Sequence, residues 1–325
     1  HTHTHTHQPQ EKTATITISH TKNPSKIPKK MKMTNKLSRF VLYFLVLVVI
    51  NFTPSVLVSS LTNPQDILAL KALKSSIKPS SIPSWSCLAS WDFSTDPCAL
   101  PRRTHFTCGV TCSPDSSRVT QLSLDPAGYS GRLSPLVSKL TSLTYLDLSG
   151  NNFYGPIPTS ISSLTSLQTL TLRSNSFSDS VPDSVLPYLK SLETLDLAHN
   201  SLSGYLPKTL ESLINLKRLD LSYNKLGGSL PKLPTNIQEL ALKANSLSGP
   251  LQVLSFSGLN NLEVVELSEN YISGTLDAWF FLLPKIQQFN LSNNTLTRVN
   301  VPKPGKDSGL VAADLGFNRI EGPVP

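Results

Sequence analysis

A phrase of the form apolar-x-apolar-x-x-Asn recurs along the chain and constrains its fold more than any other feature. The asparagines that close the phrase are Asn151, Asn175, Asn200, Asn224, Asn245, Asn270, Asn294 and Asn318. They are separated by 21 to 25 residues, and a degenerate ninth copy, "LSLDPA", precedes them at residues 122–127. Chance does not produce this period, which is typical of a chain that folds as a stack of similar coils.

Within each copy the spacing predicts a short strand with two different faces. Alternate side chains of a strand point in opposite directions, so we expect Leu146 and Leu148 in a core. Tyr145, Asp147 and Ser149 then face solvent. One coil cannot bury its own leucines, so we expect the coils to stack and their strands to form a parallel sheet along the inner side of a curved solenoid. The Asn column is predicted to be structural, with each amide satisfying backbone groups in the turn after the strand.

A second extended segment is expected after each Asn, where "FYGPIP", "FSDSVP", "LSGYLP" and "LGGSLP" occur. Glycine permits unusual backbone angles, and proline lacks an amide hydrogen to donate, so proline should end this segment before the outer arm of the coil. Two coils are irregular. The step to Asn245 is the short one, with "PKLPTN" in place of a longer outer arm, which predicts a local change of curvature. Near the end, "LDAWFFLLP" predicts Phe280 inward and Trp279 and Phe281 outward, either as a contact site or packed on the neighbouring arm.

The phrase and its "LxGxIP"-like continuation resemble the plant-specific type of leucine-rich repeat, found in extracellular receptor-like proteins and receptor kinases. The resemblance covers about residues 63–325. It implies an α/β-type solenoid, a horseshoe with a concave parallel β-sheet and a disulfide-bonded N-terminal cap. It also implies recognition of a peptide or protein ligand through the concave surface in cell-surface signalling, with a co-receptor as a further partner.

The segment before the repeats predicts a cap for the first coil. Asn63 and Pro64 open a stretch that is expected to be helical, and Leu70, Leu73 and Ile77 share one face of it. "SWDFSTDPC" and "FTCGVTC" resemble the cysteine-paired cap of the family. The four cysteines of this segment are Cys87, Cys98, Cys108 and Cys112. An even, clustered set in a secreted chain favours two disulfides over a zinc site, with three connectivities open.

The first sixty residues are predicted to lie outside the fold. Residues 1–30 form a low-complexity leader, and strict His-Thr alternation is what a CA-dinucleotide repeat encodes. We therefore interpret them as sequence ahead of a start at Met31 or Met33, with metal binding as the alternative. Residues 31–60 have the basic start, eleven-residue apolar run and small-residue end of a signal peptide, with a retained anchor as the alternative. The cap is assigned to residues 61–118 and about nine repeats, the last truncated, to 119–325.

The charge distribution argues against nucleic-acid binding. The formal charge is +8, from 29 basic and 21 acidic residues. Residues 1–60 hold eight of the basic residues and one acid, which leaves 21 basic and 20 acidic side chains from residue 61 onward. A phosphate backbone needs a clustered basic face, and the repeats show none. Membrane attachment is expected only through a segment outside this chain.

The side chains between the structural positions of the strands are the candidate ligand-binding residues. They are Tyr145, Arg173, Arg218, Asp220, Glu239, Lys243, Glu266 and Gln288. Some receptors of the family that this sequence resembles hold the carboxylate of a peptide with an Arg-x-Arg pair in one strand. This sequence has no such pair, so Arg173 and Arg218 would act separately. Acids recur at the strand midpoints, but "LDLS" is the family's ordinary phrase, and we interpret that column as structural filler.

No catalytic residues, cofactor or metal site is predicted. His199 is a lone residue in a turn, and no Gly-rich phosphate loop is present in the sequence. Asn290 and Asn293 open N-glycosylation sequons, and glycans there would cover the concave surface near that coil. The chain is therefore expected to be a non-enzymatic protein, secreted or at the outer face of the plasma membrane or in the cell wall. The alternatives are a soluble inhibitor of a cell-wall-degrading enzyme, similar to polygalacturonase inhibitors, and the ectodomain of a receptor kinase.

Overall fold

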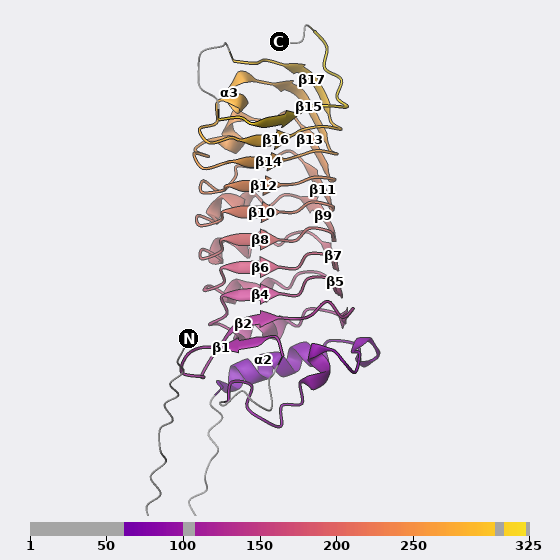
Figure 1. Ribbon diagram of the computed structural model, residues 1–325, viewed down its shortest axis with the longest axis vertical. Helices are drawn as coiled ribbons and strands as arrows, with labels where there is room; N and C mark the ends of the chain where they lie inside the picture. Colours follow the sequence, from indigo (N-terminus) through magenta and orange to yellow (C-terminus); the bar gives the residue numbers. More distant parts are fainter. Residues whose placement is uncertain (1–61, 100–107, 303–308, 323–325) are drawn as a thin grey trace, which may run out of the picture. The chain divides into compact units, whose positions relative to one another are not determined.

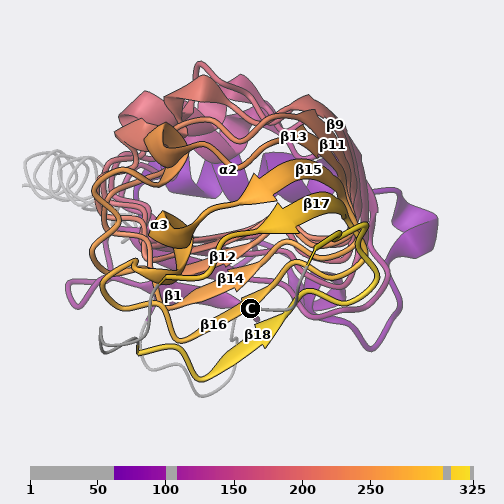
Figure 2. The same ribbon diagram turned by 90° about the horizontal axis from the view of Figure 1, so that it is seen from above.

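A computed structural model describes residues 62–99, 108–302 and 309–322. The proposed leader and signal peptide lie outside the described residues. The described chain is a stack of coils, and most coils pass in turn through a strand of one sheet, a strand of a second sheet and a helical turn (Figure 1). Seen along the stack, the coils lie over one another, with the sheets and the helical turns on different sides (Figure 2). No described helix combines the length and apolar character needed to cross a membrane.

Two sheets run the length of the stack. The larger sheet is parallel except at its β1–β2 edge, and the order of its strands follows the order of the chain. Its strands are β1 (Val110–Cys112), β2 (Val119–Ser123), β4 (Tyr145–Asp147), β6 (Thr169–Thr171), β8 (Thr194–Asp196), β10 (Arg218–Asp220), β12 (Glu239–Ala241), β14 (Val264–Glu266), β16 (Gln288–Asn290) and β18 (Ala312–Asp314). The register places each repeat residue beside its counterpart, as Leu146 beside Leu122 and Leu170. The parallel sheet predicted from the repeat phrase is therefore present.

The second extended segments of the coils pair into a smaller sheet, which the sequence analysis did not anticipate. Its strands are β3 (Ser130–Gly131), β5 (Asn152–Gly155), β7 (Ser176–Asp179), β9 (Ser201–Tyr205), β11 (Lys225–Gly228), β13 (Ser246–Gly249), β15 (Tyr271–Leu276) and β17 (Thr295–Val299). The proline after these segments lies where the chain enters the helical turn, as Pro158 does before η4. The helical segments are α2 (Pro64–Ser75), α3 (Ala278–Phe281), η1 (Pro79–Ser81), η2 (Cys87–Ser90), η3 (Pro135–Lys139), η4 (Thr159–Ser163), η5 (Leu186–Tyr188), η6 (Lys208–Ser212) and η7 (Val253–Phe256).

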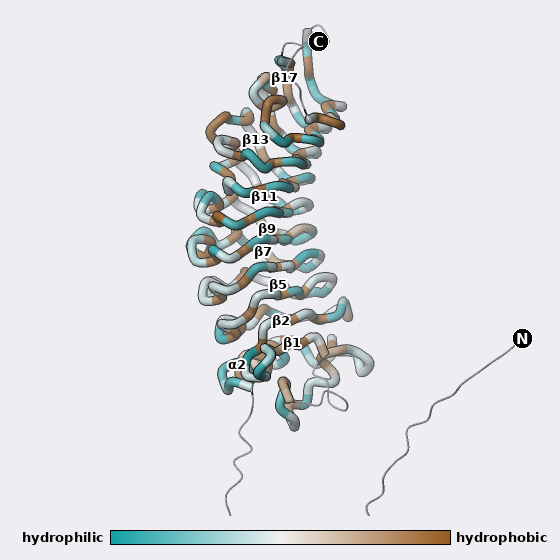
Figure 3. The backbone as a smooth tube through the Cα atoms, turned by 60° about the vertical axis from the view of Figure 1, so that its left-hand side comes forward, coloured by the Kyte–Doolittle hydropathy of each residue, from teal (hydrophilic) through white to brown (hydrophobic). Residues whose placement is uncertain are grey.

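The repeated apolar residues form one continuous core between these sides. Leu146 and Leu148 are fully buried, as the alternation predicts, and so are their counterparts in the neighbouring coils. Polar and apolar stretches alternate along the coils from the first to the last (Figure 3). Phe153 and Phe177 stack with ring centroids 6.2 Å apart between consecutive coils. Burial of each coil therefore depends on its neighbours, as expected of a solenoid.

Each repeated Asn joins two coils. The Asn224 Oδ1 accepts a hydrogen bond from the Leu202 backbone N–H (2.9 Å) in the preceding coil. Its Nδ2 donates to the carbonyls of Leu197 (3.0 Å) and Leu221 (3.1 Å). The other asparagines of the column repeat this pattern, as Asn270 does with Leu247 N–H (3.0 Å). The structural role predicted for the column is confirmed.

The two irregular coils differ from the rest in their outer arms. In the short coil, the described chain runs from β11 to β12 without a helical turn. In the later coil, α3 replaces a 3₁₀ turn. Phe281 is buried against Phe289, with centroids 5.5 Å apart, so its predicted outward orientation is wrong. A helical turn rotates successive side chains by about 100°, so Phe280 and Phe281 can both face the core. Trp279 packs on Phe256 at 5.6 Å, which supports packing rather than a contact site.

The cap closes the N-terminal end of the stack. Helix α2 begins as predicted, with the Asn63 side chain accepting from the Gln65 N–H at 2.9 Å, and Leu70, Leu73 and Ile77 are buried. Both predicted disulfides are formed, and their pairing is Cys87–Cys108 and Cys98–Cys112. They tie η2 and the loop after it to β1. The cap covers the edge strand and apolar end that an open solenoid would expose.

Candidate ligand-binding face

The solvent side of the larger sheet forms a continuous surface, here called the inner face. It comprises, for each strand from β2 to β18, the outward side chains of the strand and the residue two positions after the strand ends. Because neighbouring strands are in register, equivalent side chains form columns across the sheet. All eight predicted ligand-binding residues lie on this face. Their role in binding stays a prediction.

The carboxylates predicted at the strand midpoints are the last residues of their strands, and they hold the turns that follow. Asp220 Oδ1 accepts from the Ser222 N–H at 3.0 Å, and Glu266 Oε1 accepts from the Ser268 N–H at 3.0 Å. Asn290 makes the same bond to Ser292 in its coil. A side-chain oxygen that accepts from the backbone N–H two residues on stabilises a tight turn. This bond gives the column the structural role that the sequence analysis assigned to it.

Arg173 is held by two of these carboxylates. Its Nη1 lies 3.3 Å from Asp220 Oδ2 and 3.8 Å from Asp196 Oδ2. Asp196 and Asp220 are register partners on β8 and β10, and both are largely buried. Burial raises the pKa of the Asp196 carboxyl, and the nearby Asp220 adds to the rise, while Arg173 lowers it. Arg173 is therefore already paired with two acids of the protein. Its guanidinium is not free for the ligand carboxylate that the sequence analysis expected it to bind.

The other two cations of the inner face are also paired. Arg218 Nη1 lies 3.3 Å from Glu239 Oε2 across β10 and β12. Lys243 Nζ lies 3.2 Å from Glu269 Oε1, and this hydrogen bond raises the pKa of the Lys243 amine. Within the described part of the inner face, every Lys and Arg thus has a carboxylate partner. A ligand carboxylate that binds one of these cations would have to displace the carboxylate already paired with it.

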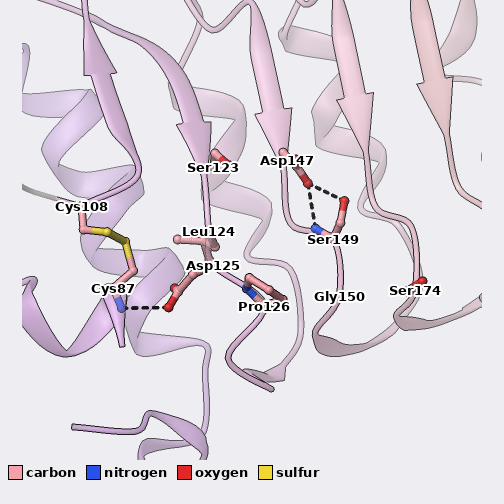
Figure 4. Close-up of a pocket in the computed structure, with 10 residues that line it drawn as sticks. All are labelled: Cys87, Cys108, Ser123, Leu124, Asp125, Pro126, Asp147, Ser149, Gly150 and Ser174. Atoms are coloured by element: carbon pink, nitrogen blue, oxygen red, sulfur yellow. Dashed lines mark hydrogen bonds between the residues drawn. A yellow bond between two sulfur atoms is a disulfide. The ribbon is translucent and has the colours of Figure 1, made fainter. Parts of the chain in front are cut away.

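Two shallow hollows lie at opposite ends of the inner face. At the C-terminal end, Glu266, Gln288, Asn290 and Asp314 line a hollow of about 310 Å³ on β14, β16 and β18. At the N-terminal end, the Cys87–Cys108 disulfide borders a hollow of about 550 Å³ that also contains Asp125 and Asp147 (Figure 4). Both hollows present carboxylates and neutral side chains. Tyr145 lies near the second, where its hydroxyl donates to Asp147 Oδ2 at 3.2 Å.

In the N-terminal hollow, the side chains are fixed by local hydrogen bonds (Figure 4). Asp125 Oδ2 accepts from the Cys87 N–H at 3.2 Å. Asp147 Oδ1 accepts from the Ser149 N–H at 2.9 Å and from the Ser149 hydroxyl. Gly150 has φ 67°, and a Cβ there would approach Pro126 Cβ to 2.9 Å. The carboxylates of this hollow are therefore pre-positioned before any ligand arrives.

A row of left-handed residues borders the inner face and was missed by the sequence analysis. This ledge consists of the residue before each Asn: Gly150, Ser174, His199, Tyr223, Ala244, Glu269, Asn293 and Phe317, all with positive φ. His199 stacks on Tyr223 with centroids 4.2 Å apart, and Lys243 Nζ lies 5.9 Å from the Tyr223 ring centre. The signal that could have found the row is its fixed position next to the Asn column.

The predicted residues are brought together in part. Arg173 meets Asp220, and Arg218 meets Glu239, while Glu266 and Gln288 share the C-terminal hollow. Tyr145 lies apart from these pairs, on β4. No cluster of His, Cys, Asp and Glu suited to a metal ion occurs in residues 62–99, 108–302 and 309–322.

Comparisons with known proteins agree with this architecture. Models described as leucine rich repeat match residues 165–226 and 235–296, and residues 142–164 and 215–240. Receptor like protein 27 of Arabidopsis thaliana is 33% identical over 99 residues, which are 29% of this chain and 12% of that protein. Receptor-like protein 7 of Arabidopsis thaliana is 34% identical over 92 residues, 28% of this chain and 9% of that protein. These alignments span only a small part of the curated relatives.

Two solved structures show the same fold over most of this chain. The crystal structure of PEPR1–AtPEP1 matches 81% of this chain and 36% of that chain, with TM-score 0.70 and 33% identity. The leucine-rich repeat ectodomain of the receptor kinase GASSHO1/SCHENGEN3 from Arabidopsis thaliana, in complex with CASPARIAN STRIP INTEGRITY FACTOR 2, matches 80% of this chain and 30% of that chain. Its TM-score is 0.68 and its identity 31%. This chain therefore spans about a third of the length of these two chains.

Proposed function

Because the chain belongs to the plant extracellular leucine-rich repeat family, we propose that its inner face recognises a peptide or protein ligand at the cell surface. The observation that carries the proposal is the in-register sheet, whose outward side chains form one rigid surface from β2 to β18. A rigid receptor loses little ordering entropy on binding, which favours an extended partner. The carboxylates of the face hold turns, so a binding role accounts for them better than acid–base catalysis does.

The charges of the inner face favour a ligand with basic side chains. Its carboxylates are Asp125, Asp147, Asp196, Asp220, Glu239, Glu266 and Asp314, and its cations are Arg173, Arg218 and Lys243. All three cations are already paired, whereas Asp147 and Glu266 have only neutral partners on the face. Lysine and arginine side chains of a ligand could pair with these acids without displacing an existing ion pair. A ligand carboxylate would lack a free cation.

Peptide binding tests the proposal directly. The chain, secreted from plant cells, is presented to a library of extended peptides of graded charge, and dissociation constants are measured by calorimetry. We expect the bound peptides to be rich in Lys and Arg and their affinity to fall as salt rises. Combining Asp147→Asn with Glu266→Gln removes two charges but keeps an oxygen for each turn. This variant should bind about tenfold more weakly, as expected for the loss of two charge-assisted contacts.

Glu211→Gln is the matched control, because Glu211 pairs with Lys232 away from the inner face and should leave affinity unchanged. Selection of acidic peptides would contradict the charge argument. Absence of binding by any peptide or by plant extracellular proteins would contradict the proposed function itself.

A further inference from the structure

Two N-glycosylation sequons, Asn290-Leu-Ser and Asn293-Asn-Thr, lie three residues apart, and the structure places them in different environments. Asn290 is the last residue of β16 and lies on the inner face. Asn293 belongs to the ledge, one residue before Asn294 of the structural column. A glycosylated chain can adopt this fold only where the fold leaves the Asn Nδ2 group free of hydrogen bonds and has room for the sugar.

Both the nitrogen and the oxygen of the Asn290 side-chain amide make hydrogen bonds. The Nδ2 group donates to Glu266 Oε2 at 3.1 Å on the neighbouring strand. The Oδ1 atom accepts from the Ser292 N–H at 3.0 Å and from the Ser292 hydroxyl at 2.7 Å. Ser292, the hydroxyl residue of this sequon, is buried. A sugar on Asn290 Nδ2 would stand on the inner face between β14 and β18 and would disturb these bonds.

Asn293 has the opposite environment. It is exposed and has φ 54°, a conformation that Asn adopts more readily than most residues. Its backbone holds the coil, because its N–H donates to Gly316 O at 2.9 Å and its carbonyl accepts from the Asn270 N–H at 3.2 Å. Its side-chain amide makes no hydrogen bond in the described structure and is free for modification. Thr295, the hydroxyl residue of this sequon, is half-buried, with its hydroxyl donating to Ile272 O at 3.0 Å.

We propose that Asn293 carries an N-linked glycan and that Asn290 does not. Both disulfides of the cap require an oxidising compartment, which for a secreted chain is also where such glycans are added. In the transfer, Nδ2 of Asn293 loses a proton and bonds to the first sugar carbon of a lipid-linked diphosphate oligosaccharide. The carbon–oxygen bond to the diphosphate breaks, and the lipid diphosphate leaves with the bonding electrons.

The glycan would rise from the ledge between Glu269 and Phe317, beside the C-terminal hollow. It would cover the exposed Phe317 ring, which is 85% accessible without it. If the inner face binds a ligand as proposed above, the glycan restricts entry near β16 and leaves the strands from β2 to β12 open. This consequence rests on the proposed function, whereas the modification itself does not.

The test locates the modified residue by mass spectrometry. The full chain is secreted from plant cells, and glycans are released by a peptide-N-glycosidase in ¹⁸O-labelled water, which converts each glycosylated Asn to labelled Asp. Trypsin cleavage after Lys285 and Arg298 yields one peptide with both sequons, and fragmentation separates the two sites. We expect the label at Asn293 alone. A label at Asn290, or at neither residue, would overturn the proposal.

Two variants serve as the controls. Asn293→Gln should lose one glycan mass from the intact protein. Asn290→Asp also destroys a sequon; it loses the bond to Glu266 but keeps the oxygen that accepts from the Ser292 N–H, as Asp220 does with Ser222 at the equivalent position of β10. It should keep the full glycan mass. Loss of the glycan in Asn290→Asp but not in Asn293→Gln would assign the site to Asn290 and refute the inference.

Discussion

The side-chain amide of Asn224 serves four backbone groups at once. Its Oδ1 accepts from Leu202, and its Nδ2 donates to Leu197, Leu221 and Ser222. All these groups are buried, so removing the amide leaves donors and acceptors without partners. We expect Asn224→Ala to lower the free energy of unfolding by about 3 kcal/mol, measured by urea denaturation followed by circular dichroism.

Asn236→Ala is the matched control for that prediction. Asn236 is exposed and makes one hydrogen bond, to Ile214 O at 2.7 Å. Its loss should cost less than about 1 kcal/mol. Equal effects of the two substitutions would mean that the Asn column contributes no more than a surface amide.

We expect Asp196 to give the folding stability a pH dependence opposite in sign to that caused by a carboxylate whose pKa a salt bridge lowers. Burial raises its pKa above the ordinary 3.8, so its ionised form destabilises the folded state at neutral pH. The penalty disappears as the pH falls through the raised folded pKa and then the unfolded value. Asp196→Asn removes the charge and can retain the bond to the Ala198 N–H, as Asn290 does with Ser292. We expect the variant to unfold at higher urea than the parent at pH 7, with the difference vanishing below about pH 4.

Asp314→Asn is the control, because Asp314 is exposed at the same column position. It should change the urea midpoint little at either pH. A lower midpoint for Asp196→Asn at pH 7 would show that its pairing with Arg173 outweighs the cost of burial.

At the scale of single residues, burial could be predicted from the sequence, but the contacts between charged side chains could not. The alternation of Leu146 and Leu148 predicted their burial, because it depends only on strand geometry. The contact of Arg173 with Asp220 joins residues 47 apart in the chain, two coils away. Such contacts depend on side-chain length and on the spacing of the strands, which the repeat phrase does not encode. The ion pairs of the inner face could therefore not be predicted from the sequence.

At the scale of the element, one buried carboxylate of helix α2 binds the stack in addition to the helix's apolar face. Asp66 is fully buried, and its oxygens accept from Arg118 Nε (3.0 Å), Arg118 Nη2 (3.0 Å) and the Val119 N–H (2.8 Å). We expect Asp66→Asn to cost about 2 kcal/mol, since it weakens charge-assisted bonds and leaves the guanidinium unpaired. Urea unfolding and the rate of trypsin cleavage at Lys71 and Lys74 measure the change.

Gln65→Ala provides the comparison, because Gln65 is exposed in the same helical turn. It should leave the trypsin cleavage rate close to that of the parent. Unchanged cleavage of Asp66→Asn would mean that the apolar face of α2 is sufficient to hold the cap.

The sequence predicted those secondary-structure elements that a single short-range sequence rule specifies. The Asn63-Pro64 start and the spacing of Leu70 and Leu73 specify α2 locally. The second sheet was missed because its segments, such as "NFYG", read as extended chain and lack an alternating apolar pattern. Their pairing follows from stacking, as neighbouring coils bring equivalent segments into register. The disulfide pairing was also undetermined, since four cysteines allow three connectivities.

At the scale of the whole stack, the first and the last described strands of the larger sheet have different surroundings. The first coils are covered by α2, β1 and both disulfides. Within residues 1–325, β18 is the last described strand of the larger sheet, and its three residues are exposed, although the equivalent strands each bury their middle residue. In a solenoid each coil gains its stability from its neighbours, so an uncovered coil opens more easily than an inner one.

Backbone hydrogen exchange should therefore show a gradient along the stack. For a protein made of residues 1–325, we expect the slowest exchange in β6 to β12, which have folded coils on both sides, and progressively faster exchange in β16 and β18. Reducing the disulfides should speed exchange in β1 and β2, because the cap then constrains the first coils less, while β10 and β12 keep their protection. Exchange measured by mass spectrometry on peptides from each coil resolves the pattern. Equal protection from β2 to β18, or simultaneous loss of protection in all strands on reduction, would mean that the stack opens as one cooperative unit and not coil by coil.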